Sequence, residues 1–168
     1  MPSKSQSVLI GAAVAAVLSL VQLFIASGGG QAGQYLSGLI CCLVAIGGAG
    51  VAVWHYTSTY RLTIPAGTGA GLGAMATGGG YLIAYAVGEI LQAVGVLPSD
   101  EEALAAAREQ LVAQGTLSAE QIEQTLEISQ MFTGVLGAVV SLILLAVVGA
   151  VVGAIAAAIF KKGEADVV

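Results

Sequence analysis

The side chain best placed to do chemistry is Glu89, an acidic residue inside a long apolar stretch. Tyr81 and Tyr85 precede it at helical spacing, so a helix would carry all three on one face, with Gln92 nearby. A charged side chain in the middle of a bilayer costs roughly 2.5–3.5 kcal/mol or more, so such residues commonly handle ions or protons. We therefore treat Glu89, Tyr81 and Tyr85 as a candidate polar intramembrane site. A structural alternative stays open, in which Glu89, near the outer end of its helix, reaches the interface or hydrogen-bonds to a tyrosine.

Glycines spaced four residues apart form a second pattern, typical of helices that pack closely in membranes. The residues predicted to pack helices, within one chain or in a homo-oligomeric seam, are Gly67, Gly69, Gly71, Gly73, Gly149 and Gly153. The run from Gly69 to Ala74 also fits the dinucleotide fingerprint G-x-G-x-x-A. That fingerprint requires a preceding strand and a βαβ unit, which the surrounding residues do not predict, so we reject a nucleotide site.

The other reactive side chains form no recognisable catalytic or metal-binding set. Cys41 and Cys42 are adjacent, without zinc or redox spacing, and are predicted to pack inside a span. His55 is the only histidine and is predicted to anchor a helix end at the interface. We expect no catalytic residue, no cofactor and no metal site, and hence no enzyme.

The composition requires lipid as the solvent for most of the chain. The 168 residues are 57% hydrophobic and 9% charged, against about 25% charged in a typical soluble domain. Four long apolar segments, at about 7–26, 35–56, 66–96 and 131–160, are each long enough to span a bilayer. A cleaved signal peptide is the alternative for the first segment. The fold class is therefore all-α: a four-helix integral membrane bundle forming one domain over residues 1–168.

Residues 98–130 are polar and separate the third span from the fourth. Ser99 with Glu102, and Ser118 with Gln121, have the spacing of capping boxes, and the first helix should end near Gly115. These residues predict an extramembrane, acidic helix–turn–helix insert whose second helix runs straight into the last span. A short flexible turn is expected over residues 27–34, between the first two spans.

Basic residues predict the orientation of the spans. Lys4, Arg61, Lys161 and Lys162 fall on one side of the predicted bundle, and only Arg108 falls on the other. The positive-inside rule then places both termini in the cytoplasm and the acidic insert outside. Nucleic acid is not an expected partner, because the chain has net charge −5 and no basic patch.

The most distinctive sequence runs are LSAEQIEQTLEISQMF, from Leu117 to Phe132, and AAIFKK, from Ala157 to Lys162. On these runs the chain resembles the bacterial membrane family catalogued as domain of unknown function 4199, most strongly from Arg61 onward. The resemblance implies a four-helix protein of the bacterial inner membrane, and it implies no activity.

Two functions remain from the sequence. The first is a structural, accessory or partner-binding bundle in contact with membrane lipid, which binds a protein through the acidic insert or a second copy through its glycine seams. The alternative is a small homo-oligomeric channel or transporter that uses Glu89.

Overall fold

The computed structural model describes residues 3–28, 30–131 and 134–160, without the side chains of residues 27–28, 30–35, 37–39, 131 and 135. The described chain is all-helical and contains no strand, which confirms the predicted class. Its helices are α1 (Ser5–Gly28), α2 (Gly30–Tyr60), α3 (Ala66–Ala93), α4 (Asp100–Gln114), α5 (Ala119–Met131) and α6 (Gly134–Ile159).

Four of these helices are long and apolar enough to cross a bilayer. The qualifying stretches are Ser5–Ala26, Ile40–Tyr60, Ala66–Ala93 and Leu136–Ile159. Large apolar side chains cover their outward faces, and Leu9, for example, is 66% exposed. Lipid tails solvate such a surface, whereas an apolar area this extensive is rare on a monomeric soluble protein. The prediction of a multi-pass membrane protein with four spans is confirmed at this level.

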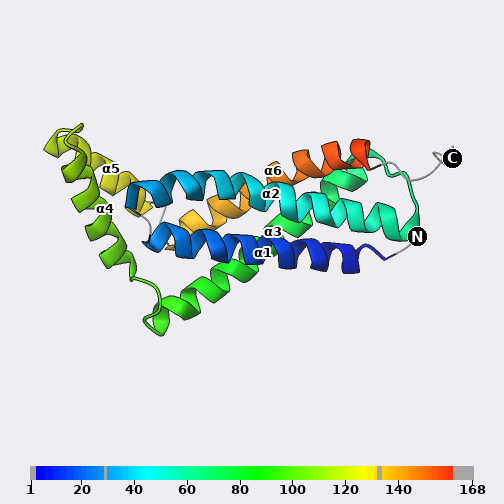
Figure 1. The fold of residues 1–168 in the computed structure, drawn as a ribbon, viewed down its shortest axis with the longest axis horizontal. Helices are drawn as coiled ribbons and strands as arrows, with labels where there is room; N and C mark the ends of the chain where they lie inside the picture. The colour runs from blue at the N-terminus through cyan, green and yellow to red at the C-terminus, as the bar shows by residue number, and fades with distance from the viewer. Residues whose placement is uncertain (1–2, 29, 132–133, 161–168) are drawn as a thin grey trace.

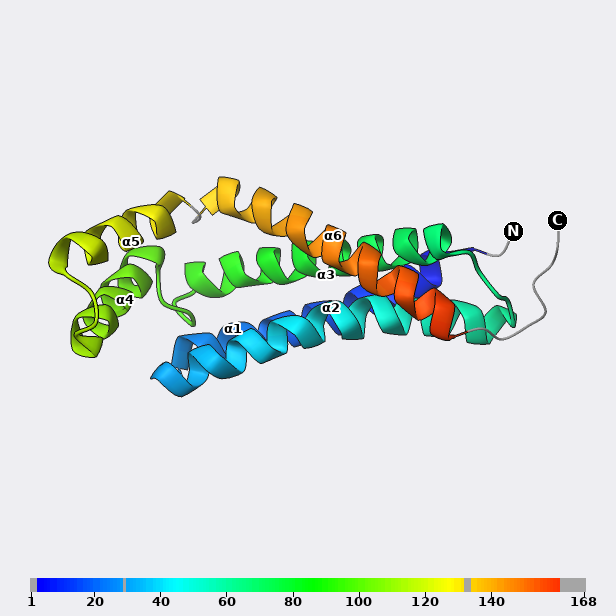
Figure 2. The same cartoon turned by 90° about the horizontal axis from the view of Figure 1, so that it is seen from above.

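The four long helices form two pairs. α1 and α2 lie side by side as a hairpin, and α3 packs against α6 (Figure 1). The two pairs meet where α3 begins and α6 ends, and we call this the closed end. They diverge toward α4 and α5, and we call this the open end (Figure 2). At the closed end, a core cluster that includes Val53, Tyr56 and Leu72 is buried among α2, α3 and α6.

The connection between α1 and α2 is shorter than the sequence suggested. The flexible turn expected over residues 27–34 is wrong, because α1 extends to Gly28 and α2 begins at Gly30. Unpaired backbone groups are costly in an apolar surrounding, and helical hydrogen bonds satisfy them even through a glycine-rich run. The second helix therefore starts before the predicted span at residue 35.

The third span ends earlier than predicted, at Ala93 rather than near residue 96. Gly95 has a φ of +74°, a backbone conformation that glycine adopts without strain. Its N–H donates to the Gln92 carbonyl, and the Val96 N–H donates to the Leu91 carbonyl, each at 2.9 Å. This pair of bonds is a Schellman motif, which satisfies carbonyl groups at the end of a helix.

The two short helices begin where their capping residues predicted. The Ser99 Oγ accepts a hydrogen bond from the Glu102 N–H at 3.3 Å, and the Glu102 carboxylate accepts one from the Ser99 N–H at 2.9 Å. Ser118 and Gln121 repeat this reciprocal pair with the same two distances. Gly115, at a φ of +63°, ends α4 at the predicted position.

The junction between α5 and α6 differs from the continuous helix that the sequence predicted. α5 ends at Met131 and α6 begins at Gly134, so the last span starts after residue 131. Gly134 has a φ of +73°, which interrupts a right-handed helix. The two helices are therefore separate elements, and α5 meets α6 at an angle (Figure 2). Lys161 and Lys162, which enter the orientation argument, lie outside the described residues.

Candidate functional site

A cleft of about 640 Å³ lies between the helix pairs toward the open end. Side chains from α1, α2, α3 and α6 all line it, so no single helix could form it alone. Apolar residues make up much of its wall, among them Leu23, Val44, Leu144 and Val148. Ligand sites in proteins are commonly about 300–1,000 Å³ and combine apolar walls with a few convergent polar groups. The cleft has this size and this kind of lining.

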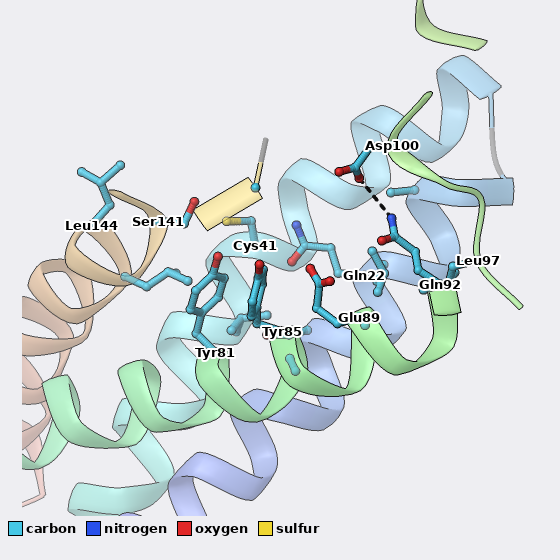
Figure 3. Close-up of a pocket in the computed structure, with 18 of the residues that line it drawn as sticks. Gln22, Cys41, Tyr81, Tyr85, Glu89, Gln92, Leu97, Asp100, Ser141 and Leu144 are labelled. Carbon is cyan, nitrogen blue, oxygen red and sulfur yellow. Dashed lines mark hydrogen bonds between the residues drawn. The ribbon is translucent and has the colours of Figure 1, made fainter. Parts of the chain in front are cut away.

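One face of α3 supplies the main polar groups. Tyr81, Tyr85 and Glu89 follow one another at successive helical turns, and all three line the cleft (Figure 3). The two tyrosine rings have centroids 6.2 Å apart and are tilted by 31°. The Tyr85 hydroxyl lies beside the Glu89 carboxylate. The structure thus brings together the three residues that helical spacing placed on one face.

Gln92 and Asp100 extend this polar face toward α4. The Gln92 Nε2 donates hydrogen bonds to the Pro98 carbonyl and to the Asp100 Oδ1, both at 3.1 Å (Figure 3). These bonds fasten the start of α4 to the last turn of α3. Helical spacing placed Gln92 near Glu89, but no sequence pattern assigned Asp100 to the site. Asp100 comes into the cleft only because the Gly95 turn brings the chain back over the end of α3.

The cleft carries acidic side chains without a basic partner among its described lining. Glu89 and Asp100 both line it, and none of the lining residues is Lys, Arg or His. Arg108 forms an ion pair with Glu123 in the α4–α5 hairpin. Lys4 precedes α1 and Arg61 follows α2, so both lie at the closed end. Glu89 itself is exposed to the cleft, four residues before α3 ends.

A seam of small residues holds α3 against α6 below the cleft. Gly69 and Gly73 on α3 face Gly153 and Gly149 on α6, and a Cβ built on any of the four would come within 3.0 Å of the opposite helix. Thr77 continues the seam: its hydroxyl lies 2.9 Å from the Gly73 carbonyl oxygen and 3.1 Å from the Leu145 carbonyl oxygen across the interface. Four of the six glycines predicted to pack helices therefore lie in this seam.

The remaining two, Gly67 and Gly71, face open space, with nothing within 4 Å of a Cβ built on them. They alternate along α3 with Gly69 and Gly73, so the helical rotation turns them to another face. This chain by itself gives them no packing partner, and their predicted role in a homo-oligomeric seam stays a prediction.

A second set of small-residue contacts, which was not predicted, joins α1 to α2 and α3. A Cβ on Gly11 would lie 2.5 Å from the Gly48 carbonyl oxygen, and one on Gly80 would lie 2.5 Å from the Ala15 Cβ. The available signal was the small-residue run GAAVAA from Gly11 to Ala16. Leu72 and Thr77, on α3, are fully buried with 0% and 1% exposure. The described residues thus close the cleft toward the closed end.

His55 has a partner that its sequence surroundings did not indicate. The Ser7 Oγ and the His55 Nδ1 are 2.9 Å apart, which joins α1 to α2. A serine next to an imidazole is also the start of a nucleophilic site. Ser7 is completely buried, however, so its hydroxyl is not open to a substrate. We assign this pair to packing between the two helices.

The prediction that both cysteines pack inside the bundle is wrong, because both are exposed. Neighbouring residues on a helix point about 100° apart, and α2 is splayed away from α3 and α6 at this level. Cys41 lines the cleft, whereas Cys42 is not part of its lining. Within the described part of the chain, no group of three or more His, Cys, Asp and Glu residues could hold a metal ion.

Comparisons with protein-family models, with curated proteins and with solved structures found no match to this chain. The resemblance to domain of unknown function 4199 therefore stays a prediction. The geometry of the cleft is the basis on which a function can be assigned.

Proposed function

We propose that this chain is a non-enzymatic accessory protein of the bacterial inner membrane that binds a small molecule in the cleft between its helix pairs. The observation that carries the proposal is the cleft itself: about 640 Å³, walled by apolar residues, with Tyr81, Tyr85 and Glu89 converging on it. Clefts that combine these features are the usual form of ligand sites.

The two seams support binding over conduction through a single copy. Gly73 and Gly149 bring the backbones of α3 and α6 into contact, and Leu72 and Thr77 fill the space beside them. A pore would need this layer to separate. A ligand could instead enter from the open end or from the side, between the diverging helices, and stop above the seam.

The orientation and the partners belong to the same proposal. Both termini lie in the cytoplasm, following the positive-inside rule, and the cleft and the α4–α5 hairpin face the outside. The hairpin presents acidic side chains, including Glu101, Glu109 and Glu120, all exposed. Such a surface is suited to docking a protein partner. No residue of α4 is buried, so the rest of the chain does not cover this helix. Membership of the domain of unknown function 4199 family is proposed on the sequence runs described above.

The adjacent cysteines provide a direct test of the cleft. Only thiolates react readily with maleimides, and a thiol needs water to ionise, so a hydrophilic maleimide distinguishes a wet cleft from lipid. The variants Cys42→Ser and Cys41→Ser leave one thiol each, at almost the same depth on α2. In intact spheroplasts we expect the reagent to label Cys41 from outside and to leave Cys42 unlabelled.

Equal labelling of the two thiols, or no labelling of Cys41, would contradict a water-accessible cleft. Labelling of Cys41 only after the membrane is opened would place the cleft on the cytoplasmic side and reverse the proposed orientation. Labelling of both thiols in SDS serves as the control that each is chemically competent.

Transport is the second candidate, because the helix pairs meet at one end and diverge at the other (Figure 2). Rocking of one pair against the other about a close-packed seam is a common route to alternating access. Glu89 would then carry the coupled ion or the substrate charge. Flux into proteoliposomes that is unchanged by Glu89→Gln would rule out this role.

A further inference from the structure

We infer that the cleft selects an amphipathic organic cation, a molecule with one positive charge and a bulky apolar body. This inference rests on the proposed function and names the chemical class of its ligand. It follows from three properties of the same cleft: its charge, its aromatic face and its apolar walls.

The charge of the lining favours a positive occupant. Glu89 and Asp100 supply two carboxyl groups, and the described lining contains no basic side chain to balance them. Arg108, the described basic residue nearest along the chain, is engaged with Glu123. A carboxylate in a weakly polar site is stabilised by an opposite charge placed against it. An anionic ligand would add repulsion, and a neutral one would leave Glu89 without a counter-charge.

The aromatic face favours an organic cation over a bare ion. Tyr81 and Tyr85 are both partly buried, with ring centroids 6.2 Å apart, and Tyr85 is the one beside Glu89. The negative face of an aromatic ring attracts a weakly hydrated cation within about 6 Å of its centroid. Two rings and a carboxylate in sequence along one helix face therefore form a site for a substituted ammonium or phosphonium group.

A metal cation fits this lining poorly. Ca²⁺ takes about 6–8 oxygen ligands, several of them carboxylates, and Mg²⁺ requires near-octahedral geometry. Within the described residues no three His, Cys, Asp or Glu side chains gather closely enough to hold a metal. The Asp100 carboxylate also already accepts a hydrogen bond from Gln92.

The apolar walls explain why the cation needs a bulky body. Leu23 of α1 and Leu144, Leu145 and Val148 of α6 belong to the apolar part of the lining. Each apolar Å² removed from water contributes about 25 cal/mol, so a hydrocarbon body adds affinity that a small ammonium ion lacks.

Two probes of the same shape and opposite charge test this inference. Tetraphenylphosphonium is the cation, and tetraphenylborate is its anionic counterpart. Binding of each is measured by equilibrium dialysis against the purified full chain in detergent, with protein-free micelles subtracted. We expect saturable binding of tetraphenylphosphonium and none of tetraphenylborate.

Variants then locate the bound cation. Glu89→Gln should weaken tetraphenylphosphonium binding several-fold, since it removes the carboxylate that lies against the bound cation. The matched control is Glu101→Gln, which removes an exposed carboxylate outside the cleft lining and should leave binding unchanged. Tyr85→Leu should weaken binding several-fold while Tyr85→Phe largely preserves it, because the ring face survives only in the second variant.

The inference is overturned if both probes bind equally, if neither binds, or if Glu89→Gln and Glu101→Gln behave alike. If Glu89→Gln does not yield folded protein, the two Tyr85 variants still test the inference. Equal binding by Tyr85→Leu and Tyr85→Phe also overturns the inference. These failures leave the proposed function intact so long as the hydrophilic maleimide labels Cys41 and spares Cys42. If Cys41 is not labelled in preference to Cys42, the proposed water-accessible cleft is wrong, and the proposed function is contradicted with it.

Discussion

Two neighbouring glycines on α3 give the sharpest test of how the bundle is held together. Gly73 lies in the seam with α6, and a Cβ added there would lie 3.0 Å from both the Gly149 carbonyl carbon and the Gly153 Cα, and closer still to the Gly149 carbonyl oxygen. Gly71, two positions before it on the same helix, has nothing within 4 Å of an added Cβ. The substitutions Gly73→Ala and Gly71→Ala therefore differ in packing and in little else.

The magnitudes follow from the two effects of the new methyl group. Replacing glycine by alanine inside a helix is worth up to about 1 kcal/mol of stability in either variant. Overpacking costs about 1–3 kcal/mol, and the upper end applies at residue 73 because the obstructing atoms are backbone that cannot rotate away. Gly73→Ala should lose about 2 kcal/mol overall, while Gly71→Ala should be neutral or gain up to about 1 kcal/mol.

Thermal stability in detergent measures the difference. The temperature at which half of the protein loses its monodisperse elution peak should separate the two variants by about 4–12 °C, at about 2–4 °C per kcal/mol for a chain of this size. If Gly73→Ala is as stable as Gly71→Ala, α3 and α6 do not approach as closely as the structure places them. The reasoning about the seam would then be wrong, and so would the floor of the cleft that rests on it.

Three further substitutions test single features. Thr77→Val removes the hydrogen bond to the Leu145 carbonyl and should lower the same melting temperature by an amount equivalent to about 0.6 kcal/mol. Thr77→Ser keeps the hydroxyl and should retain most of this stability. An equal loss in both variants would show that packing, and not the hydrogen bond, is responsible. Ser99→Ala removes the first capping box and should cost about 1 kcal/mol, seen as faster amide hydrogen exchange in α4 with α3 unchanged. Arg61 has a φ of +52°, so Arg61→Gly should gain about 1 kcal/mol of thermal stability while Arg61→Ala gains none, and a gain in both would trace the effect to charge.

Local interactions account for what could be read from the sequence. Ser99 with Glu102, and Ser118 with Gln121, satisfy backbone groups only three residues away, so the start of each short helix depends on neighbouring residues alone. Tyr81, Tyr85 and Glu89 share a face for the same reason, since helical periodicity places them there once the helix forms. Two predictions about glycine were wrong for opposite reasons. Residues 27–34 were expected to form a turn because glycine weakens helices in water, but an apolar surrounding favours helical hydrogen bonds. At Gly134 a continuous helix was expected, but glycine adopts a positive φ there and interrupts it.

The sequence by itself determined four apolar spans, an acidic pair of capped helices and one polar face on α3, because each depends on composition or on spacing within a single helix. Only the tertiary structure decided that Gly69 and Gly73 pack while Gly67 and Gly71 do not, and that Cys41 but not Cys42 lines the cleft. The physical reason lies in the solvent. In water, an apolar stripe shows which face of a helix turns inward, but lipid solvates apolar side chains on every face, so the rotation of each helix is set by close packing with its neighbours. Glu89 thus belonged to a candidate face from the sequence, and the diverging helix pairs gave that face a cleft.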